Sequence, residues 1–324
     1  RDWPIDFRAV PPSVGPMEKK TEMDRFGALS LIGFAILLAF NQVVIKVTNE
    51  GFQPVFFAGL RSAGAIVVVA LWLRYRGLSL TVPRDVLPFA VLIGVAFAVE
   101  FIFLFIALDL TTVARTSVLF YTMPVWLALL AHFFIPGEAL TPLKGAGLAL
   151  AVAGVVVAFA GRQGGPASLA GDLLSIAGAM SWASLAFLAK GTRLRTLRPE
   201  VQLFWQVLVS APILLVAAPL FGDLIRDVQA IHLWGLAFQI LIVVGAGFIF
   251  WLWLLSIYPA AAVASFSFLT PVFGVGLGWL LLDEAVGAEL LVALALVAAG
   301  LFLINRQVPQ KVRETRSSGA GGAV

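Results

Sequence analysis

Long apolar stretches of nearly 20 residues recur along most of this chain, separated by short segments that carry Gly, Pro and charged residues. A helix of about 20 apolar residues is long enough to cross the hydrocarbon core of a bilayer. The composition agrees, because 60% of the residues are hydrophobic and 12% are charged, whereas soluble domains have about 25% charged residues. The sequence therefore predicts an all-α membrane protein and disfavours a soluble helical fold.

Turn residues and charges divide the apolar sequence into ten predicted spans. They cover residues 28–47, 54–73, 86–108, 112–135, 142–160, 170–190, 199–220, 233–257, 259–282 and 286–304. The predicted organisation is a tail (1–27, with 1–16 as a leader or cloning remnant before Met17), a first five-helix unit (28–160), a linker (161–169), a second five-helix unit (170–304) and a second tail (305–324).

Basic residues indicate the orientation of the spans. With the N-terminus inside, 17 of the 22 Lys and Arg residues fall in cytoplasmic segments and 3 in outer segments. Positive charge gathers on cytoplasmic loops of membrane proteins. We therefore expect a multi-pass protein of the cell inner membrane with both tails in the cytoplasm.

One sequence pattern occurs twice in the chain. The segment SVLFYTMPVWLALLAHFFIPGE (117–138) corresponds to SFSFLTPVFGVGLGWLLLDE (265–284), and an offset of 147 residues places Pro124 on Pro271. A duplicated unit with an odd number of spans must enter the membrane from opposite sides in its two copies. The sequence thus predicts two inverted five-helix repeats, an arrangement that many transporters share.

These residues resemble the EamA family of the drug/metabolite transporter superfamily. The matching marks are Pro124 and Pro271, the closing PGE (136–138) and LDE (282–284), and the spacing of Gly145 and Gly154; the second copy keeps Gly300 but lacks a counterpart of Gly145. The resemblance implies export of small metabolites, often amino acids and among them aromatic ones, by alternating access. It also implies a central cavity lined by the first, third, fourth, sixth, eighth and ninth spans. Efflux of drugs or nucleoside-like compounds is the alternative.

The prolines and the closing glutamates each allow two interpretations. Pro124 and Pro271 remove a backbone donor within a span, which produces either a hinge at the cavity or a static bend satisfied by Thr122 and Thr270. Glu284 is expected to cap the helix that follows it, and a gate carboxylate is the alternative interpretation. The same two interpretations apply to Glu138.

Ionisable residues inside spans are the strongest functional signal, because buried charges are costly and usually face a cavity or a partner. Arg61 and Glu100 lie in the outer halves of adjacent spans, and we predict that they pair directly or through water. The pair is either a permanent structural link or part of a substrate-responsive outer gate. Lys46 and Lys190 are expected to extend to the membrane interfaces, and Arg115 lies near the outer boundary.

Aromatic and amide side chains within spans supply the remaining cavity candidates. Trp182 and Trp251 lie well away from the interfacial positions that tryptophan prefers. Tyr121 and Asn41 add polar groups that need partners when buried. For each aromatic residue alone, packing or contact with lipid is the simpler interpretation, and cavity lining is expected for the set.

Other functions find little support in the sequence. The chain has no cysteine and two isolated histidines, and it shows no metal, P-loop or hydrolase motif. We therefore expect no enzyme activity, metal or cofactor, and no channel filter. The expected partners are a small-molecule substrate and the lipid bilayer, without nucleic acid, in a monomer or homodimer.

Overall fold

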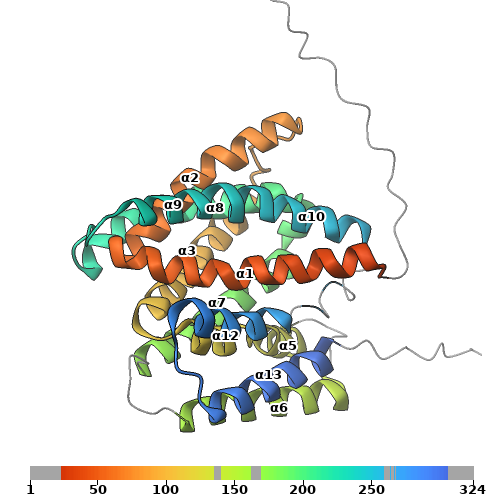
Figure 1. Ribbon diagram of the computed structural model, residues 1–324. Helices are drawn as coiled ribbons and strands as arrows, with labels where there is room; N and C mark the ends of the chain where they lie inside the picture. Colours follow the sequence, from red (N-terminus) through yellow and green to blue (C-terminus); the bar gives the residue numbers. More distant parts are fainter. Residues whose placement is uncertain are drawn as a thin grey trace, which may run out of the picture.

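The computed structural model describes residues 23–134, 140–161, 169–258 and 268–305, together with residues 263 and 266. These residues are almost entirely helical, and Phe52 and Ile225 form an isolated antiparallel bridge. Nine of the described helical segments are long and apolar enough to cross a membrane, and Leu269–Leu282 is a shorter apolar helix (Figure 1). The fold is that of a ten-helix membrane protein.

The helices divide between the two halves as the repeat predicts. The first half contains α1 (Arg25–Gly51), α2 (Pro54–Tyr75), α3 (Leu87–Leu110), α4 (Val113–Phe120), α5 (Met123–Phe134) and α6 (Pro142–Ala160). The second contains α7 (Leu169–Gly191), α8 (Pro199–Ala217), α9 (Ala230–Phe238), a π-helix (Gln239–Gly247), α10 (Phe248–Ile257), α12 (Leu269–Leu282) and α13 (Ala288–Asn305). Short 3-10 turns at Arg193–Thr196 and Ala218–Phe221 flank α8.

The fourth predicted span is broken rather than continuous. Helix α4 ends at Phe120 and α5 begins at Met123, so the break falls just before Pro124, whose ring nitrogen has no proton to donate. The Thr122 hydroxyl donates to the Leu119 carbonyl at 2.6 Å and so satisfies part of the broken turn. In the second copy, Pro271 lies in the first turn of α12. The motif residues 136–138 and most of 259–267 lie outside the described residues.

The eighth predicted span also differs from a regular helix. It begins at Ala230 instead of residue 233, and its middle is a nine-residue π-helix, Gln239–Gly247, which joins α9 to α10. Such wide turns are rare and occur frequently at functional sites. Nothing in the apolar pattern of this segment predicts the change of helix type.

The two halves interdigitate. Helix α6 packs on α13, α3 on α7 and α8, α2 on α8, and α1 on α12, so that each of these pairs joins one half to the other. The closest approach is between α6 and α13. There a Cβ added to Gly147 would lie 2.7 Å from the carbonyl oxygen of Gly300, which only glycine avoids. Small residues on α6 and α13 therefore allow the two halves to approach closely.

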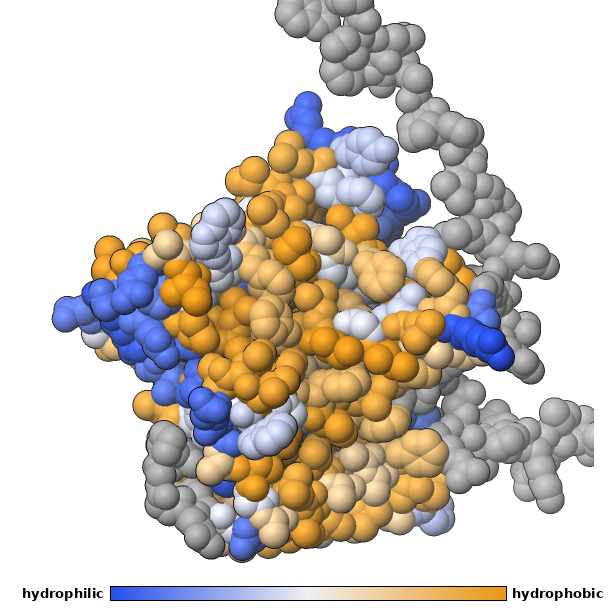
Figure 2. All heavy atoms as spheres, viewed as in Figure 1, coloured by the Kyte–Doolittle hydropathy of each residue, from blue (hydrophilic) through white to orange (hydrophobic). Residues whose placement is uncertain are grey.

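The outer surface is suited to lipid. Large apolar side chains point outward along the helices, among them Leu71, Val216, Leu220 and Trp279. Figure 2 shows hydrophobic residues over the middle of the visible face and hydrophilic residues at its margins. An apolar surface of this extent would be unfavourable in water and is favourable in a bilayer.

The bundle has two distinct ends. Helix α1 begins and α13 ends on the same side, the right-hand side of Figure 1, which we call the termini end. At the opposite end α1 and α3 finish and α4 and α7 begin. We call this second end the clamped end, because of the contacts described next.

Candidate functional site: a clamped end and a buried central group

A carboxylate from far along the chain holds the first turn of α4 at the clamped end. Glu284, in the loop between α12 and α13, accepts hydrogen bonds from the N–H groups of Val113 at 2.7 Å and Ala114 at 2.8 Å. The preceding Asp283 adopts a left-handed backbone conformation with φ of 52°, which turns the chain after α12. The prediction that Glu284 caps the helix following it is therefore wrong. It caps α4, because α12 packs against α4 and its end reaches the start of that helix.

Opposing influences act on the pKa of the Glu284 carboxyl group. Burial raises the pKa of this carboxyl group above its ordinary value, whereas the N–H groups of Ala114 and Val113 and the charge of Lys46 lower it. Burial is the largest of these influences. Protonation of Glu284 is thus easier in this arrangement than in water.

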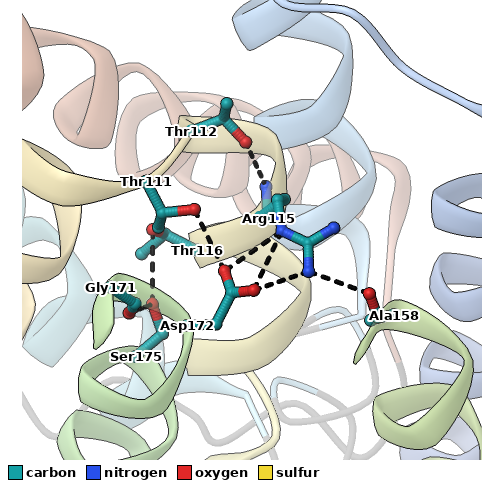
Figure 3. Close-up of polar contacts among 8 residues, drawn as sticks. All are labelled: Thr111, Thr112, Arg115, Thr116, Ala158, Gly171, Asp172 and Ser175. Atoms are coloured by element: carbon teal, nitrogen blue, oxygen red, sulfur yellow. Dashed lines mark hydrogen bonds and ion pairs between the residues drawn. The ribbon is translucent and has the colours of Figure 1, made fainter. Parts of the chain in front are cut away.

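A buried ion pair links α4 to α7 next to this cap (Figure 3). The Arg115 Nε lies 3.1 Å from both carboxylate oxygens of Asp172, and its Nη2 lies 2.6 Å from Oδ2. The same Nη2 donates to the Ala158 carbonyl of α6 at 2.8 Å. Asp172 is fully buried and also accepts a hydrogen bond from the Thr111 hydroxyl at 3.0 Å. This bidentate geometry satisfies both charges and joins three helices.

Two further cations complete the contacts at this end. Lys46 donates to the carbonyl oxygens of Leu108 at 3.0 Å and Thr111 at 2.7 Å, which caps the C-terminus of α3. The expectation that Lys46 extends to the interface is replaced by this cap, since the last carbonyls of a helix attract positive charge. Arg226, in the loop before α9, binds Asp109 through two hydrogen bonds of 2.7 and 2.9 Å.

These contacts form what we call the clamp, made of Glu284 with α4, Arg115 with Asp172, and Arg226 with Asp109. Each of the three joins a residue of the first half to a residue of the second half. The clamp therefore ties the two halves together at one end of the bundle.

The termini end is joined more loosely in the part of the chain that the structure describes. An ion pair between Arg193 and Asp85, at 2.9 Å, connects the halves there, and both side chains are more than half exposed. The Tyr258 hydroxyl also donates to Asp24 at 2.7 Å, and the Trp205 indole N–H donates to the Leu80 carbonyl at 3.1 Å. A cavity of about 210 Å³ opens between α5, α6, α7 and α13 at this end. Its lining includes Pro124, Phe187 and Lys190.

Arg61 of α2 and Glu100 of α3 are buried in the bundle, with exposed fractions of 8% and 5%. Their charges interact, but no ion pair or hydrogen bond joins them among the contacts of the described residues. The Arg61 Cζ lies 4.4 Å from the centre of the Phe101 ring, and the buried Nε has no hydrogen-bond partner within the described chain. A pair bridged by water stays a prediction.

Tyr121 brings the helix break of the first half close to this charge. Its side chain lies within the field of Glu100 and interacts with Thr270 at the start of α12. Trp182 of α7 meets Tyr121 edge-on, with ring centres 5.7 Å apart, and stacks on Phe120 at 5.1 Å. Four residues singled out in the sequence therefore gather in one place. This central group consists of Arg61, Glu100, Tyr121 and Trp182.

Asn41 and Trp251 belong to a different part of the bundle. The Asn41 side-chain oxygen accepts a hydrogen bond from the amide of Gln239, the first residue of the π-helix. Trp251 stacks on Phe34 of α1, with ring centres 4.8 Å apart and 18° between the ring planes. These two candidates thus link α1 to the eighth span, apart from the contacts of the central group.

Two polar residues of this interior, Gln239 and Asp172, escaped the sequence analysis. Gln239 is fully buried, and its Oε1 has no partner among the described residues. Gln42, which follows Asn41 in the first span and is itself a buried amide, accepts a hydrogen bond from Ser117 of α4 at 2.6 Å. Asp172 was missed because it lies close to the Gly-rich linker, where a charged residue is expected to belong to the loop and not to the helix.

The fold and these contacts define a polytopic membrane protein of two inverted, interlocked halves. The chain belongs to the EamA-like transporter family, which matches residues 25–160 and 169–306. It is thus a transporter of the metabolite-carrying kind, as the sequence resemblance implies.

Individual relatives agree with this assignment. The chain is 30% identical to a probable amino-acid metabolite efflux pump of Escherichia coli (strain K12), over 86% of this chain and 93% of that one. It is 34% identical to the aromatic amino acid exporter YddG of Ancylobacter novellus, over 47% of this chain and 55% of that protein. A solved crystal structure with 23% identity superposes with a TM-score of 0.60 over 86% of this chain and 97% of the other, which supports the fold.

Proposed function

We propose that this transporter exports amino acids from the cytoplasm by alternating access, with the clamped end facing outward. The observation that carries the proposal is the unequal closure of the two ends. At the clamped end, buried polar contacts, including an ion pair, join the halves. At the termini end, the halves share an exposed ion pair and hydrogen bonds from Tyr258 to Asp24 and from Trp205 to the Leu80 carbonyl, and a cavity opens between them. The arrangement fits a carrier that is closed outside and nearer to opening inside.

The orientation in this proposal comes from the basic residues. The termini end carries Arg193 and Lys190, and most Lys and Arg residues of the sequence fall on the same predicted side. Cytoplasmic loops carry such an excess. The clamped end then faces the exterior, and the cavity at the termini end faces the cytoplasm.

The substrate class in the proposal draws support from the relatives and from the central group. One relative is a probable amino-acid metabolite efflux pump and another an aromatic amino acid exporter. The central group offers buried charges of both signs beside aromatic rings. Amino acids carry both charges, and many of them carry an apolar side chain.

Purified protein in proteoliposomes tests the proposal through counterflow of labelled compounds. We expect saturable exchange of one or more neutral amino acids, competed by unlabelled amino acids. Nucleosides and cationic drugs serve as the comparison panel. Exchange of those compounds without exchange of any amino acid would contradict the proposed substrate class while leaving the carrier intact.

A further inference from the structure

We propose that Arg61 and Glu100 each bind one of the two charged groups of a zwitterionic substrate. Arg61 binds the substrate carboxylate, Glu100 binds its ammonium group, and the aromatic rings beside them receive the apolar side chain. This inference rests on the proposed function and assigns residues to the substrate class named there.

The first argument is the cost of the two charges. Removing an ionised group from water costs several kcal/mol unless close contacts replace the lost hydration. Asp172 and Arg115 have such contacts, with three short hydrogen bonds between them. Arg61 has the face of Phe101 instead, and its Nε is buried without a partner. A donor left unsatisfied in this way is suited to an acceptor that arrives with a ligand.

The second argument is that the scaffold does not require these charges. In this part of the repeat Pro54 corresponds to Pro199, an offset of 145 residues, which places Arg61 on Gln206. At the offset of 147, Glu100 falls on Gly247, at the end of the neutral sequence Gly-Ala-Gly. The second half forms the corresponding membrane spans with neutral residues at these positions, although its counterpart of α3 contains the π-helix. A charge is therefore not needed at either position to form a span, and the charges of the first half are available for another role.

The third argument is chemical complementarity. A planar guanidinium group binds a carboxylate through two parallel hydrogen bonds, and a carboxylate accepts strong hydrogen bonds from an ammonium group. A zwitterion satisfies Arg61 and Glu100 together and leaves the net charge of the buried site unchanged. A cation would leave Arg61 uncompensated, and an anion would leave Glu100 uncompensated.

The fourth argument is the surroundings of the two charges. Phe101 lies under the guanidinium group, and its ring centre is 4.2 Å from that of Phe97 one turn away. Tyr121 lies close enough to Glu100 for the two side chains to interact, and Trp182 meets Tyr121 edge-on with ring centres 5.7 Å apart. An amino acid side chain placed there meets aromatic faces, which bind large apolar groups well.

The experiment compares whole amino acids with analogues that lack one charge. Phenylalanine, phenylalaninamide (without the carboxylate) and 3-phenylpropionate (without the ammonium group) form one series, and leucine with its two matching analogues forms another. Binding to the purified protein is measured in detergent, and counterflow is measured in proteoliposomes. In the wild type we expect each analogue to bind at least about tenfold more weakly than the amino acid, because a hydrogen bond to a charged group contributes about 1.5–3 kcal/mol.

Variants then assign each charge to its residue. Arg61→Gln should weaken binding of the amino acid at least about tenfold and leave the amide unchanged, because the amide never used the guanidinium group. Glu100→Gln should weaken the amino acid and leave 3-phenylpropionate unchanged. Arg193→Gln and Asp85→Asn, which remove the same charges from the exposed pair, should bind all compounds as the wild type does. Equal weakening of all compounds in both central variants would overturn the proposal.

Failure of this assignment can be distinguished from misfolding of the variants and from failure of the proposed function. If the single variants unfold, the double variant Arg61→Gln with Glu100→Gln is used, because it keeps the net charge of the protein unchanged. This double variant should bind the amino acid no better than its analogues. Preservation of the wild-type preference in the double variant would also overturn the proposal. If the wild type carries nucleosides or cationic drugs and no amino acid, the proposed function fails, and this assignment fails with it.

Discussion

Two ion pairs of the same chemistry connect the halves at opposite ends of the molecule. Arg115 and Asp172 meet at 2.6 Å with side chains 9% and 0% exposed, whereas Arg193 and Asp85 meet at 2.9 Å with side chains 62% and 56% exposed. A buried pair is strongly coupled to the fold once formed, because loss of one partner leaves the other uncompensated. An exposed pair contributes about 0–1 kcal/mol. The ion pair at the clamped end is therefore harder to break than the ion pair at the termini end.

In the proposed transport cycle, the clamped end undergoes the larger rearrangement. Opening it would require Glu284, Asp172 and Arg226 to exchange protein partners for water or for one another. Opening the termini end would break an exposed ion pair and the hydrogen bonds from Tyr258 to Asp24 and from Trp205 to Leu80, but no buried ion pair among the described residues.

Breaking the buried pair should have the largest effect on stability. Asp172→Asn leaves Arg115 buried without its counter-charge, and we expect a loss of about 3–5 kcal/mol in the free energy of unfolding. Thermal unfolding in detergent and the yield of monodisperse protein measure it. Asp85→Asn, which breaks the exposed pair, should change stability by about 1 kcal/mol or less. Equal losses in the two variants would remove the distinction between the ends.

Removing the cap of α4 should have the next largest effect. Glu284→Ala leaves the N–H groups of Val113 and Ala114 without their acceptor, and each buried unsatisfied donor costs about 1–3 kcal/mol. We expect a fall in the unfolding midpoint and faster hydrogen exchange at the start of α4. The matched control is Glu289→Ala, because Glu289 is exposed in the first turn of α13. A midpoint for Glu284→Ala as high as that of the control would show that the cap is not significant.

A smaller effect is expected at the rim of the clamp. Arg226→Gln removes the two hydrogen bonds to Asp109, but both side chains are partly exposed and water can replace them. We expect a loss of about 1 kcal/mol, in the range of partly exposed ion pairs. Urea unfolding in detergent with Arg195→Gln as the control, at an exposed position, measures it. A loss as large as that of Asp172→Asn would contradict the ranking by burial.

The smallest expected effect is a dependence of the clamp on pH. Because burial raises the pKa of Glu284, the clamped form binds a proton more tightly than a form in which this carboxyl group is exposed to water. Lowering the pH from above the raised pKa towards the ordinary carboxyl value should favour the clamped form, and raising it should favour opening. Hydrogen exchange at the start of α4 measures this trend. Glu284→Gln, which does not titrate, should lack it; a trend of the opposite sign would contradict the assignment.

Much of the fold followed from the sequence because helix length in a bilayer is a strong constraint. The apolar stretches and the doubled proline pattern predicted the spans and their inversion. The break before Pro124 was anticipated in position, since proline removes a backbone donor. The π-helix at Gln239–Gly247 was not, because it depends on packing between α1, α2 and the eighth span and not on local sequence.

None of the contacts of the clamp was predicted, although the sequence contained part of the information needed. Arg115 begins the fourth span and Asp172 begins the sixth, and inverted topology places both starts at the same end of the bundle. This signal was available in the sequence and could have paired them. The target of Glu284 was not available, because the cap of α4 exists only where the end of α12 packs against the start of a helix about 170 residues earlier.

Alternating access around the clamp is tested most directly by measuring distances between spin labels at the clamped end and at the termini end of the protein in a membrane. The chain has no cysteine, so spin labels attach only where cysteines are introduced. The pair Leu110→Cys with Ala288→Cys reports on the clamped end, and the pair Phe133→Cys with Lys190→Cys reports on the termini end. In proteoliposomes we expect a short distance at the clamped end without substrate. A transported amino acid should add a longer distance at the clamped end and a shorter one at the termini end. Distances that stay unchanged at both ends, or that lengthen together, would contradict alternating access around this clamp.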